Sequence, residues 1–449
     1  MAKVDLPRLA AHDVLRAVRS DDAYTNLALP AAIARHRLGP RDAAFTTELA
    51  SGTIRRQGTY DAVLAACVNR PLGKVDPAVL DALRLGAHQL LAMRVPAHAA
   101  ISTSVDLTRF RGNVGAAGFV NAVLRKVAER DLDAWVERVA PDPGSDPVGH
   151  AAIVHSHPAW VVEELRRALG AAELEALLAA DNAPPRVTLV ARPGRADRAE
   201  LPGEPTAYSP YGAVLEGGNP AAVPAVAEGR AGVQDEGSQL VPLLLVRASL
   251  DAPDRTWVDL CAGPGGKSAL LAGLAAERGA GLVAVERQHH RSRLVAAALA
   301  GADGVTGVLT ADGTAPPLHP ASADRVLVDA PCTGLGALRR RPEARWRRQP
   351  EDLDTLVPLQ RLLLAAAIEL VRPGGVVVYA TCSPVLAETA EVVTAALNAR
   401  PDVAMEDAEA LLAGVPDCAG PIPGTVQMWP HRHGTDAMFM ALLRRSLHP

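Results

Sequence analysis

Aromatic residues and lysines are scarce in this chain. Phe, Trp and Tyr make up 3% of its residues, so its cores must be built mainly from Ala, Leu and Val, and few rings are available to stack on bases. The net charge of −4 excludes a uniformly basic coat for nucleic acid. Four lysines stand beside forty-two arginines. In a chain that uses arginine so freely, Lys267 is a candidate for a role that arginine cannot fill.

The chain also lacks a long apolar run and a cysteine framework. Its best apolar stretch, 362–380, is interrupted by charged residues and by Pro-Gly-Gly, so no segment reaches the roughly 18 apolar residues of a membrane span. Charged residues also interrupt the apolar core that an N-terminal signal peptide needs. Five cysteines without any C-x-x-C spacing exclude a disulfide framework and a zinc site. We therefore expect a cytoplasmic protein with no membrane partner and no metal.

With 449 residues, 49% of them apolar, the chain is long enough for about three domains. Residues 1–140 carry 19 basic and 14 acidic side chains, a charge of +5 against −9 for the rest, and their apolar residues recur at helical spacing. After a linker at 141–147, we expect a small α/β subdomain at 150–245 and a catalytic domain at 246–449. The predicted helices are 8–19, 41–67, 80–91, 98–109, 115–130, 158–180 and 235–247, and the predicted strand of the subdomain is 187–190.

From residue 255 onward, short apolar runs rich in β-branched residues alternate with helical stretches. This alternation predicts an α/β fold with a parallel sheet, whose ligands bind beyond the carboxyl ends of the strands. Polar and glycine-rich segments follow these strands, at the sheet edge where a ligand would lie. The predicted strands are 256–258, 281–285, 305–309, 325–328 and 376–379.

The loop after the first of these strands, Asp259–Ser268, has three interpretations. A phosphate-binding P-loop fails because Cys261 stands where its first glycine is needed. A dinucleotide-binding loop is weakened because Ser268 replaces its third glycine. The third interpretation is a loop whose Gly263 and Gly265 let the backbone approach S-adenosylmethionine (AdoMet), with a tight structural turn as the alternative.

Acidic residues follow three successive strands at this edge. Glu286 ends the second strand, where a carboxylate can accept hydrogen bonds from both ribose hydroxyls of an adenosine cofactor. Asp312, after the third strand, is placed to contact the adenine or the methionine amine. Each acid alone is more often a solvated loop residue. Together with Asp259, however, they indicate a cofactor site at this edge of the sheet.

Two cysteines follow the last two strands. Cys332 comes after Asp329-Ala-Pro, and Cys382 comes after Thr381. Either one alone would most often be a small buried apolar residue. Together they predict chemistry on a pyrimidine, because a thiolate that attacks C6 gives C5 the enamine character to accept a methyl group from a sulfonium. Asp329 near N3 would stabilise the attacked ring, and the second thiol could help to remove the C5 proton.

These segments resemble motifs of the NOL1/NOP2/Sun family of RNA cytosine-C5 methyltransferases. The N-terminal region resembles a NusB-type RNA-binding helical domain. The resemblance covers nearly the whole chain, and the pair of cysteine motifs is its most specific part. The matching segments are Asp259–Ser268, Asp329–Gly334, Thr381–Ser383, Arg339–Trp346 and Val233–Gln239 in the catalytic half, and Arg94–His98 and Phe119–Arg125 in the N-terminal half.

The resemblance implies a Rossmann-like class I methyltransferase core with a small α/β subdomain, preceded by an all-α NusB-like domain at 1–140. It implies that Cys382 is the nucleophile and Cys332 assists product release, with reversed roles as the main alternative, and that Lys267 and Asp329 reach toward the base. The expected substrate is a cytosine of 16S ribosomal RNA or of a small-subunit precursor, and we expect a monomer. The implied AdoMet site consists of Cys261, Ala262, Gly263, Pro264, Gly265, Gly266, Lys267, Glu286, Asp312 and Asp329.

The chain departs from the family pattern at two cofactor positions. Gly263 stands where Ala is usual, which we expect only to loosen the loop, and Glu286 replaces the commoner Asp. Rival functions are methylation of tRNA or another RNA, a non-catalytic RNA-binding assembly or antitermination factor, and a nicotinamide-dependent oxidoreductase. Arginines that follow the Pro-Cys motif are expected to grip phosphates, or else to form a solvated loop: Arg339, Arg340, Arg341, Arg345, Arg347 and Arg348.

Overall fold

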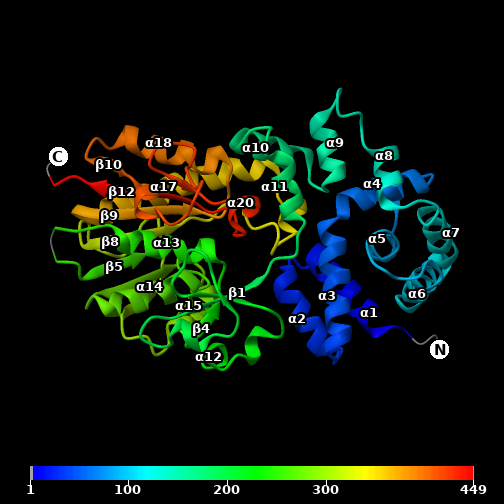
Figure 1. Cartoon of the computed structure of the whole chain (residues 1–449), viewed down its shortest axis with the longest axis horizontal. Coiled ribbons are helices and arrows are strands. Elements are labelled where there is room, and N and C mark those ends of the chain that lie inside the picture. The colour runs from blue at the N-terminus through cyan, green and yellow to red at the C-terminus, as the bar shows by residue number, and fades with distance from the viewer. Residues whose placement is uncertain (1–3, 252, 448–449) are drawn as a thin grey trace. The chain divides into compact units, whose positions relative to one another are not determined.

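The computed structural model describes residues 4–251 and 253–447. The chain forms two compact units (Figure 1). The first is helical and contains the chain up to residue 166, together with 171–183 and 338–347. The second is an α/β unit that contains the remaining residues. The segment 338–347 therefore packs with the helical unit, although its neighbours in sequence on both sides belong to the α/β unit.

Helices of this unit begin where the sequence offers a side chain that can cap the first turn. The carboxylate of Asp76 accepts hydrogen bonds from the backbone N–H groups of Ala78 and Val79, and Pro77 occupies the first helical position. The helices are α1 Leu6–Ser20, α2 Thr25–Arg35, α3 Pro40–Arg55, α4 Gln57–Cys67, α5 Pro77–Leu91, α6 Ala97–Phe110, α7 Ala117–Val127, α8 Leu132–Val139, α9 Pro147–Val154, α10 Ala159–Leu169, α11 Leu174–Asp181 and α16 Ala344–Arg347.

Two predicted helices are interrupted in the structure. The predicted helix 41–67 is divided into α3 and α4 at Arg56. The predicted helix 158–180 is divided into α10 and α11 because Gly170 adopts a φ of 88°, which ends a right-handed helix. Periodicity alone did not reveal these breaks, since the apolar spacing continues across both of them.

The main sheet of the α/β unit has the strand order β10-β12-β9-β8-β5-β6-β7, with β11 paired to β12. The pairs among β5 to β9 are parallel, as predicted. The strands β12 and β10, which the sequence did not predict, add antiparallel pairs at one edge. The strands are β5 Thr256–Asp259, β6 Gly281–Glu286, β7 Val305–Thr310, β8 Ala323–Asp329, β9 Val371–Thr381, β10 Val403–Glu406, β11 Val426–Gln427 and β12 Phe439–Arg445.

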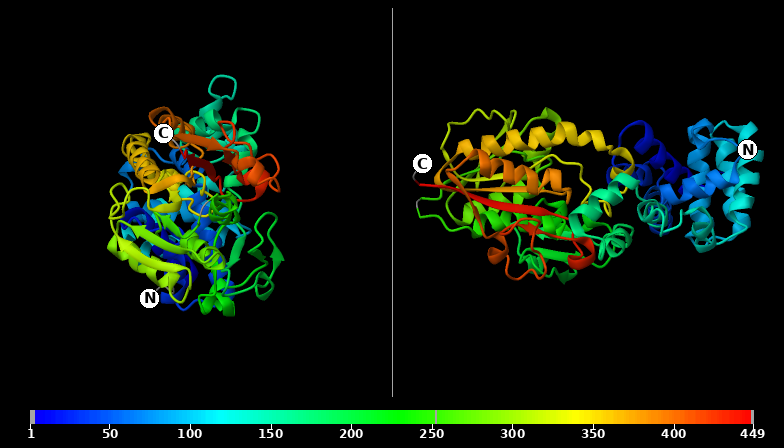
Figure 2. Two further views of the ribbon diagram at one scale, coloured as in Figure 1. Left: turned by 90° about the vertical axis from the view of Figure 1, so that its left-hand side faces the viewer. Right: turned by 90° about the horizontal axis from the view of Figure 1, so that it is seen from above.

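Helices cover both faces of this sheet, as the views of the α/β unit show (Figures 1 and 2). Side chains of β5, β8 and β9 alternate between two buried apolar clusters, so that Trp257 faces one cluster and Val258 the other. The first cluster contains α13, α14, α15 and α19, and the second contains α17 and α18. Their bounds, with those of the short helices α12 and α20, are α12 Pro224–Ala227, α13 Glu236–Arg247, α14 Gly266–Glu277, α15 His289–Leu299, α17 Leu353–Leu370, α18 Ala390–Ala399, α19 Ala408–Leu411 and α20 Pro430–His433.

A smaller antiparallel sheet with the order β2-β3-β1-β4 precedes the main sheet in the sequence. Its strands are β1 Val187–Ala191, β2 Glu204–Pro205, β3 Gly212–Leu215 and β4 Ala231–Val233.

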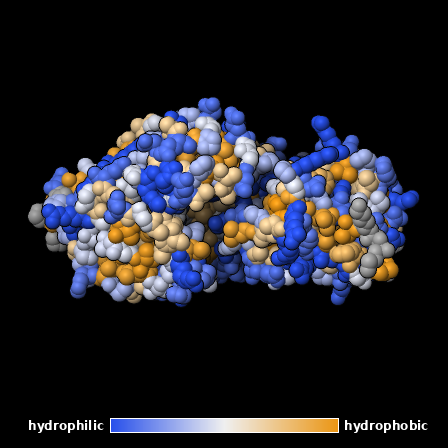
Figure 3. Space-filling view, turned by 90° about the horizontal axis from the view of Figure 1, so that it is seen from below, coloured by the Kyte–Doolittle hydropathy of each residue, from blue (hydrophilic) through white to orange (hydrophobic). Residues whose placement is uncertain are grey.

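Hydrophobic and hydrophilic residues are interspersed over the face drawn in Figure 3. Within the described residues, every helix is too short or too polar to cross a membrane.

The helical unit offers a matched pair of leucines to test its packing. Leu124 in α7 is fully buried in an apolar cluster, whereas Leu27 in α2 is 65% exposed. We expect Leu124→Ala to lower the free energy of unfolding by about 2–5 kcal/mol, because it leaves a cavity. Leu27→Ala should change it by less than about 0.5 kcal/mol. Urea denaturation followed by circular dichroism would measure both values, and equal losses would contradict the packing described.

Candidate active site

The glycine-rich loop connects the end of β5 to the start of α14. The carboxylate of Asp259 accepts hydrogen bonds from the Ser268 hydroxyl at 2.6 Å and from the backbone N–H of Cys261 at 3.2 Å. These contacts tie the strand end to the first turn of the helix. Gly265 has a φ of 112°, and a Cβ there would lie 2.6 Å from the Cβ of Ala298. The loop can therefore pass close to α15 only with a glycine at this position.

Glu286 ends β6 and turns its carboxylate toward the glycine-rich loop. Its side chain is nearly buried, and one of its oxygens accepts a hydrogen bond from the backbone N–H of Gln288 at 2.9 Å. Arg291 lies 3.5 Å from the other oxygen and donates a hydrogen bond to the Gly263 carbonyl at 2.6 Å. A Cβ added to Gly263 would lie 2.0 Å from the Glu286 carboxylate. Gly263 thus provides the space that the longer Glu286 side chain occupies, which goes beyond the expected loosening of the loop.

An ion pair joins α14 to the end of β8. The ammonium of Lys267 donates to the Asp329 carboxylate at 2.7 Å, and both side chains are mostly buried. Burial alone would lower the pKa of Lys267, but the adjacent Asp329, with further charge from Cys382 and Asp259, raises it instead. Lys267 therefore stays charged beside the two cysteine loops, which arginine could achieve only with a larger head group.

Asp312 differs from the other predicted cofactor acids. Its side chain is 44% exposed, and hydrogen bonds from the backbone and hydroxyl of Thr314 lower its pKa. Arg287 lies 3.7 Å from the carboxylate. The acid is thus ionised and accessible at the end of β7.

Cys332 and Cys382 follow the neighbouring strands β8 and β9, and their sulfur atoms lie 3.5 Å apart. Both side chains are partly exposed. The hydrogen bond with Cys382, together with burial, raises the pKa of Cys332 well above its usual value. Cys332 therefore stays protonated at neutral pH.

A buried carboxylate holds the loop that carries Cys332. Glu388 accepts hydrogen bonds from the backbone N–H of Thr333 at 2.8 Å, from the Thr333 hydroxyl at 2.5 Å and from the Gln360 amide at 3.0 Å. The Thr333 and Ser383 hydroxyls lie 3.0 Å apart, which connects the two cysteine loops. Charged acceptors make strong hydrogen bonds, so this network fixes the sulfur positions.

Gly336 brings the same two loops together through the backbone. Its N–H donates to the Cys382 carbonyl at 2.9 Å, and a Cβ there would lie 2.2 Å from the Ala437 carbonyl oxygen.

Sequence analysis missed the supporting residues Thr333, Gln360 and Glu388 as well as Arg291. Only Glu388 had a usable signal, as an acid among apolar residues six positions after Cys382.

The expected phosphate grip of six arginines is wrong for Arg345. This side chain is fully buried in the helical unit, where it donates to the Ser156 carbonyl at 3.0 Å and to the Asp181 carbonyl at 3.1 Å. Burial lowers its pKa to about 9. Arg347 donates to the Ala23 carbonyl at 2.9 Å. The sequence showed the charges of this segment, but it did not show that these guanidinium groups donate hydrogen bonds to backbone carbonyls.

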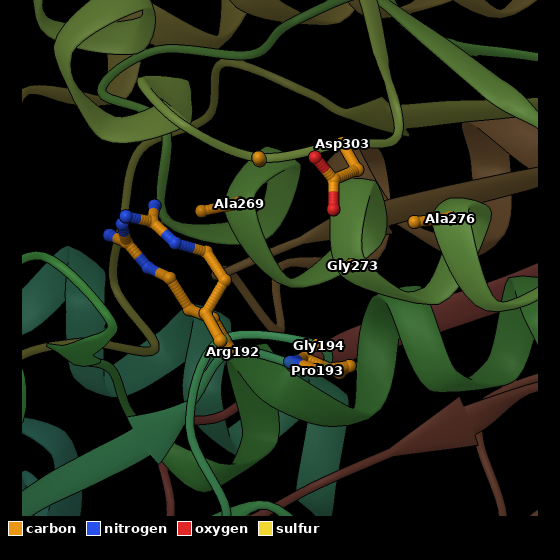
Figure 4. Close-up of a pocket in the computed structure, with 9 residues that line it drawn as sticks. Arg192, Pro193, Gly194, Ala269, Gly273, Ala276 and Asp303 are labelled. Atoms are coloured by element: carbon orange, nitrogen blue, oxygen red, sulfur yellow. The ribbon is translucent and has the colours of Figure 1, made fainter.

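A shallow pocket of the α/β unit lies beside α14, away from the cysteines (Figure 4). Arg192 donates at 2.8 Å to the carbonyl of Ala298 in α15, and Pro193 packs against Gly273. Its lining contains none of the residues predicted for catalysis or cofactor binding, so we assign it to the packing of the small sheet against α14 and α15.

Comparison with known proteins gives this geometry a family. Residues 249–444 match the family profile described as 16S rRNA methyltransferase RsmB/F, and residues 6–129 match the NusB family. The Ribosomal RNA small subunit methyltransferase B of Pseudomonas syringae is 35% identical over 97% of this chain and 96% of its own. The Mycobacterium tuberculosis protein Rv1407, named as a methyltransferase without a substrate, is 52% identical over 98% of this chain and 97% of its own.

The chain belongs to the RsmB/F family of RNA methyltransferases. Solved structures agree: the crystal structure of PH0851 has a TM-score of 0.81 and 25% identity over 99% of this chain and all of its own. NSun6 from Pyrococcus horikoshii, at 17% identity, has a TM-score of 0.53 over 66% of this chain and 100% of its own, which supports the fold alone. The expected all-α N-terminal part and class I methyltransferase core are thus confirmed, and RsmB/F membership implies AdoMet as the methyl donor.

The close approach of Gly263 and Glu286 in this RsmB/F protein predicts a coupled pair. We expect Gly263→Ala to weaken AdoMet binding roughly tenfold, because its Cβ displaces the carboxylate that we expect to hold the ribose. Glu286→Asp should also weaken binding, since the carboxylate retreats by one methylene.

The double variant should bind more tightly than the two separate losses predict, because the shorter acid makes room for the methyl group that Gly263→Ala introduces. Calorimetric titration of the two single variants and the double variant with AdoMet tests this coupling, and thermal unfolding checks that each variant is folded. Strictly additive losses of AdoMet-binding free energy would contradict the conclusion that Gly263 and Glu286 share one space.

The buried carboxyl group of Asp259 makes the stability of the fold depend on pH. Burial raises its pKa to about 6, against the hydrogen bond from Ser268, which lowers it. Between about pH 4 and 6 the unfolded chain loses this proton while the folded chain keeps it, so stability falls as pH rises and levels off above about 6. The raised pKa corresponds to about 3 kcal/mol.

Asp259→Asn keeps a hydrogen-bond acceptor but cannot titrate. It should therefore remove this part of the slope of unfolding free energy against pH. Urea denaturation at several pH values would measure it, with the exposed Asp312→Asn as the control that keeps the slope. An unchanged slope in Asp259→Asn would contradict the assignment of this titration to Asp259.

Proposed function

We propose that this protein transfers a methyl group from AdoMet to C5 of a cytosine in 16S ribosomal RNA, through a covalent bond between Cys382 and C6 of the base. The observation that carries the proposal is the pair of sulfur atoms 3.5 Å apart at the ends of two adjacent parallel strands. A C5 methylation needs one sulfur to attack the ring and a second group to remove a proton next to it. This site supplies two sulfur atoms side by side.

The residues at the end of β5 and β6 fit an adenosine cofactor. The loop from Cys261 to Gly266 combines a left-handed glycine with a nearby carboxylate, Glu286, whose second oxygen lies 3.5 Å from Arg291. We assign AdoMet binding to this edge, with Ala262, Gly263, Pro264, Gly265 and Lys267 in the loop and Asp312 and Asp329 at the strand ends. When bound, AdoMet supplies the electrophilic methyl group.

The electrostatics of the site favour Cys382 as the nucleophile. Lys267 lies close enough for Cys382 to contribute to its raised pKa, so the ammonium stabilises a negative charge on that sulfur. Asp329, held by Lys267, is placed to hydrogen-bond the polar edge of the cytosine. The target base must be unpaired or flipped out to reach the sulfur.

Cys332 is suited to the later step. Its high pKa depends first on the hydrogen bond with Cys382, and this contact changes once the Cys382 sulfur is bonded to carbon. Cys332 can then lose its proton to solvent and accept the C5 proton. The electron pair left at C5 restores the C5–C6 double bond, and the Cys382 sulfur leaves C6 as a thiolate. We assign RNA binding to the helical domain at 1–140 and catalysis to 246–449, with the subdomain 150–245 between them in sequence.

The experiment is transfer of a labelled methyl group from AdoMet to unmodified 16S ribosomal RNA. We expect label in cytosine C5 with the wild type, and a loss of roughly a thousandfold or more with Cys382→Ala. Cys332→Ala should accumulate a protein–RNA adduct that survives a denaturing gel, because release is blocked. Cys418→Ala, which changes a buried cysteine outside the site, is the matched control and should keep its activity.

Each other outcome has a definite meaning. An adduct with Cys382→Ala and none with Cys332→Ala would reverse the roles of the two sulfurs. RNA binding without transfer by the wild type would favour a non-catalytic assembly factor, and label on tRNA alone would move the substrate to another RNA.

A further inference from the structure

The two site cysteines differ from Cys67 and Cys418 in their surroundings. Cys67 and Cys418 are buried, whereas Cys332 and Cys382 are partly exposed and face each other. We propose that Cys332 and Cys382 form an oxidisable dithiol, which a peroxide converts into a disulfide that stops methyl transfer and which a thiol reductant restores. The inhibition rests on the proposed function, but the formation of the disulfide does not.

The sulfur atoms of the site already lie close to the distance of a disulfide bond. They are 3.5 Å apart, on loops that follow the adjacent parallel strands β8 and β9. The sulfur atoms have to approach by about 1.5 Å to reach bonding distance. Hydrogen bonds of Gly336 and Ser383 tie the two loops together. We therefore expect rotation of the cysteine side chains to close this gap.

The oxidation balances with a peroxide as the only added reactant. The Cys382 thiolate attacks one oxygen of hydrogen peroxide, the O–O bond breaks, and a sulfenic acid and hydroxide form. The Cys332 sulfur then attacks the sulfenic sulfur, so that the S–S bond forms and the S–O bond breaks. The proton of Cys332 leaves with that oxygen as water. In total the two thiols lose two hydrogen atoms, and the peroxide is reduced to two waters.

The surrounding charges assign the order of these events. Lys267, paired with Asp329, lies near Cys382 and favours its thiolate, which is the form that reacts with peroxide. The hydrogen bond with Cys382 and burial, with the charges of Glu388 and Asp329, raise the pKa of Cys332, so Cys332 takes the part of the resolving thiol. A resolving thiol next to the sulfenic acid protects Cys382 from irreversible oxidation. Both sulfurs are consumed in the disulfide, so neither is left to attack a base.

The test treats the full-length protein with hydrogen peroxide and reads the product by mass. We expect the intact mass to fall by two hydrogen atoms, and a digest without reductant to contain one crosslinked pair of peptides with Cys332 and Cys382. Dithiothreitol should remove the crosslink. Methyl transfer, assayed in the same samples, should fall in proportion to the crosslinked fraction and return with dithiothreitol.

Matched variants identify the sulfurs. Cys332→Ser and Cys382→Ser should each lose the crosslink, whereas Cys67→Ser, Cys261→Ser and Cys418→Ser should keep it. In Cys332→Ser, which lacks the resolving thiol, we expect Cys382 to proceed to the sulfinic acid. The wild-type mass readout remains valid even if one variant fails to fold.

Three results would overturn the dithiol. They are an unchanged mass while methyl transfer is intact, a sulfinic acid at Cys382 of the wild type without a crosslink, or a crosslink to Cys261. A crosslink in a protein that transfers no methyl group would instead contradict the proposed function and leave the dithiol standing.

Discussion

The parallel pairing of β8 and β9 is the constraint on which the site depends. Parallel strands end at the same edge of a sheet, so residues that follow them meet although fifty positions separate Cys332 from Cys382. The pairing runs from Ala323 to Asp329, and its last register position, Asp329 beside Ala380, directly precedes both cysteine loops. The 3.5 Å between the sulfurs follows from this register, and so do both the proposed nucleophilic chemistry and the proposed oxidation.

Strand pairing brings the loops together, but buried hydrogen bonds hold the sulfurs in place. Glu388 is fully buried and accepts three hydrogen bonds, two of them from Thr333, the residue next to Cys332. A carboxylate is an expensive group to bury, and these donors offset the cost. Its position six residues after Cys382 couples the two cysteine loops through one carboxyl group.

Space in the cofactor edge is shared between two residues. The Glu286 carboxylate occupies the volume that a side chain at position 263 would need, and Arg291 anchors both by contacting the carboxylate and the Gly263 carbonyl. The two departures from the family pattern are therefore one adjustment: the longer acid requires the glycine. A comparison of the positions one at a time could not reveal this, because the contact lies between two different loops.

The sequence by itself determined the class of the fold and predicted most residues of the candidate site. Apolar runs located the five parallel strands. The motifs after them predicted a site with the cysteines, Lys267 and the acids, because a parallel sheet places its strand ends together. Only the tertiary structure decided where distant segments pair or pack. It placed antiparallel β12 beside β9, it buried Arg345 among carbonyls of the helical unit, and it brought Glu388 to Thr333. Local periodicity reports which side of an element is buried, whereas the partner that buries it is a long-range choice that no single segment encodes.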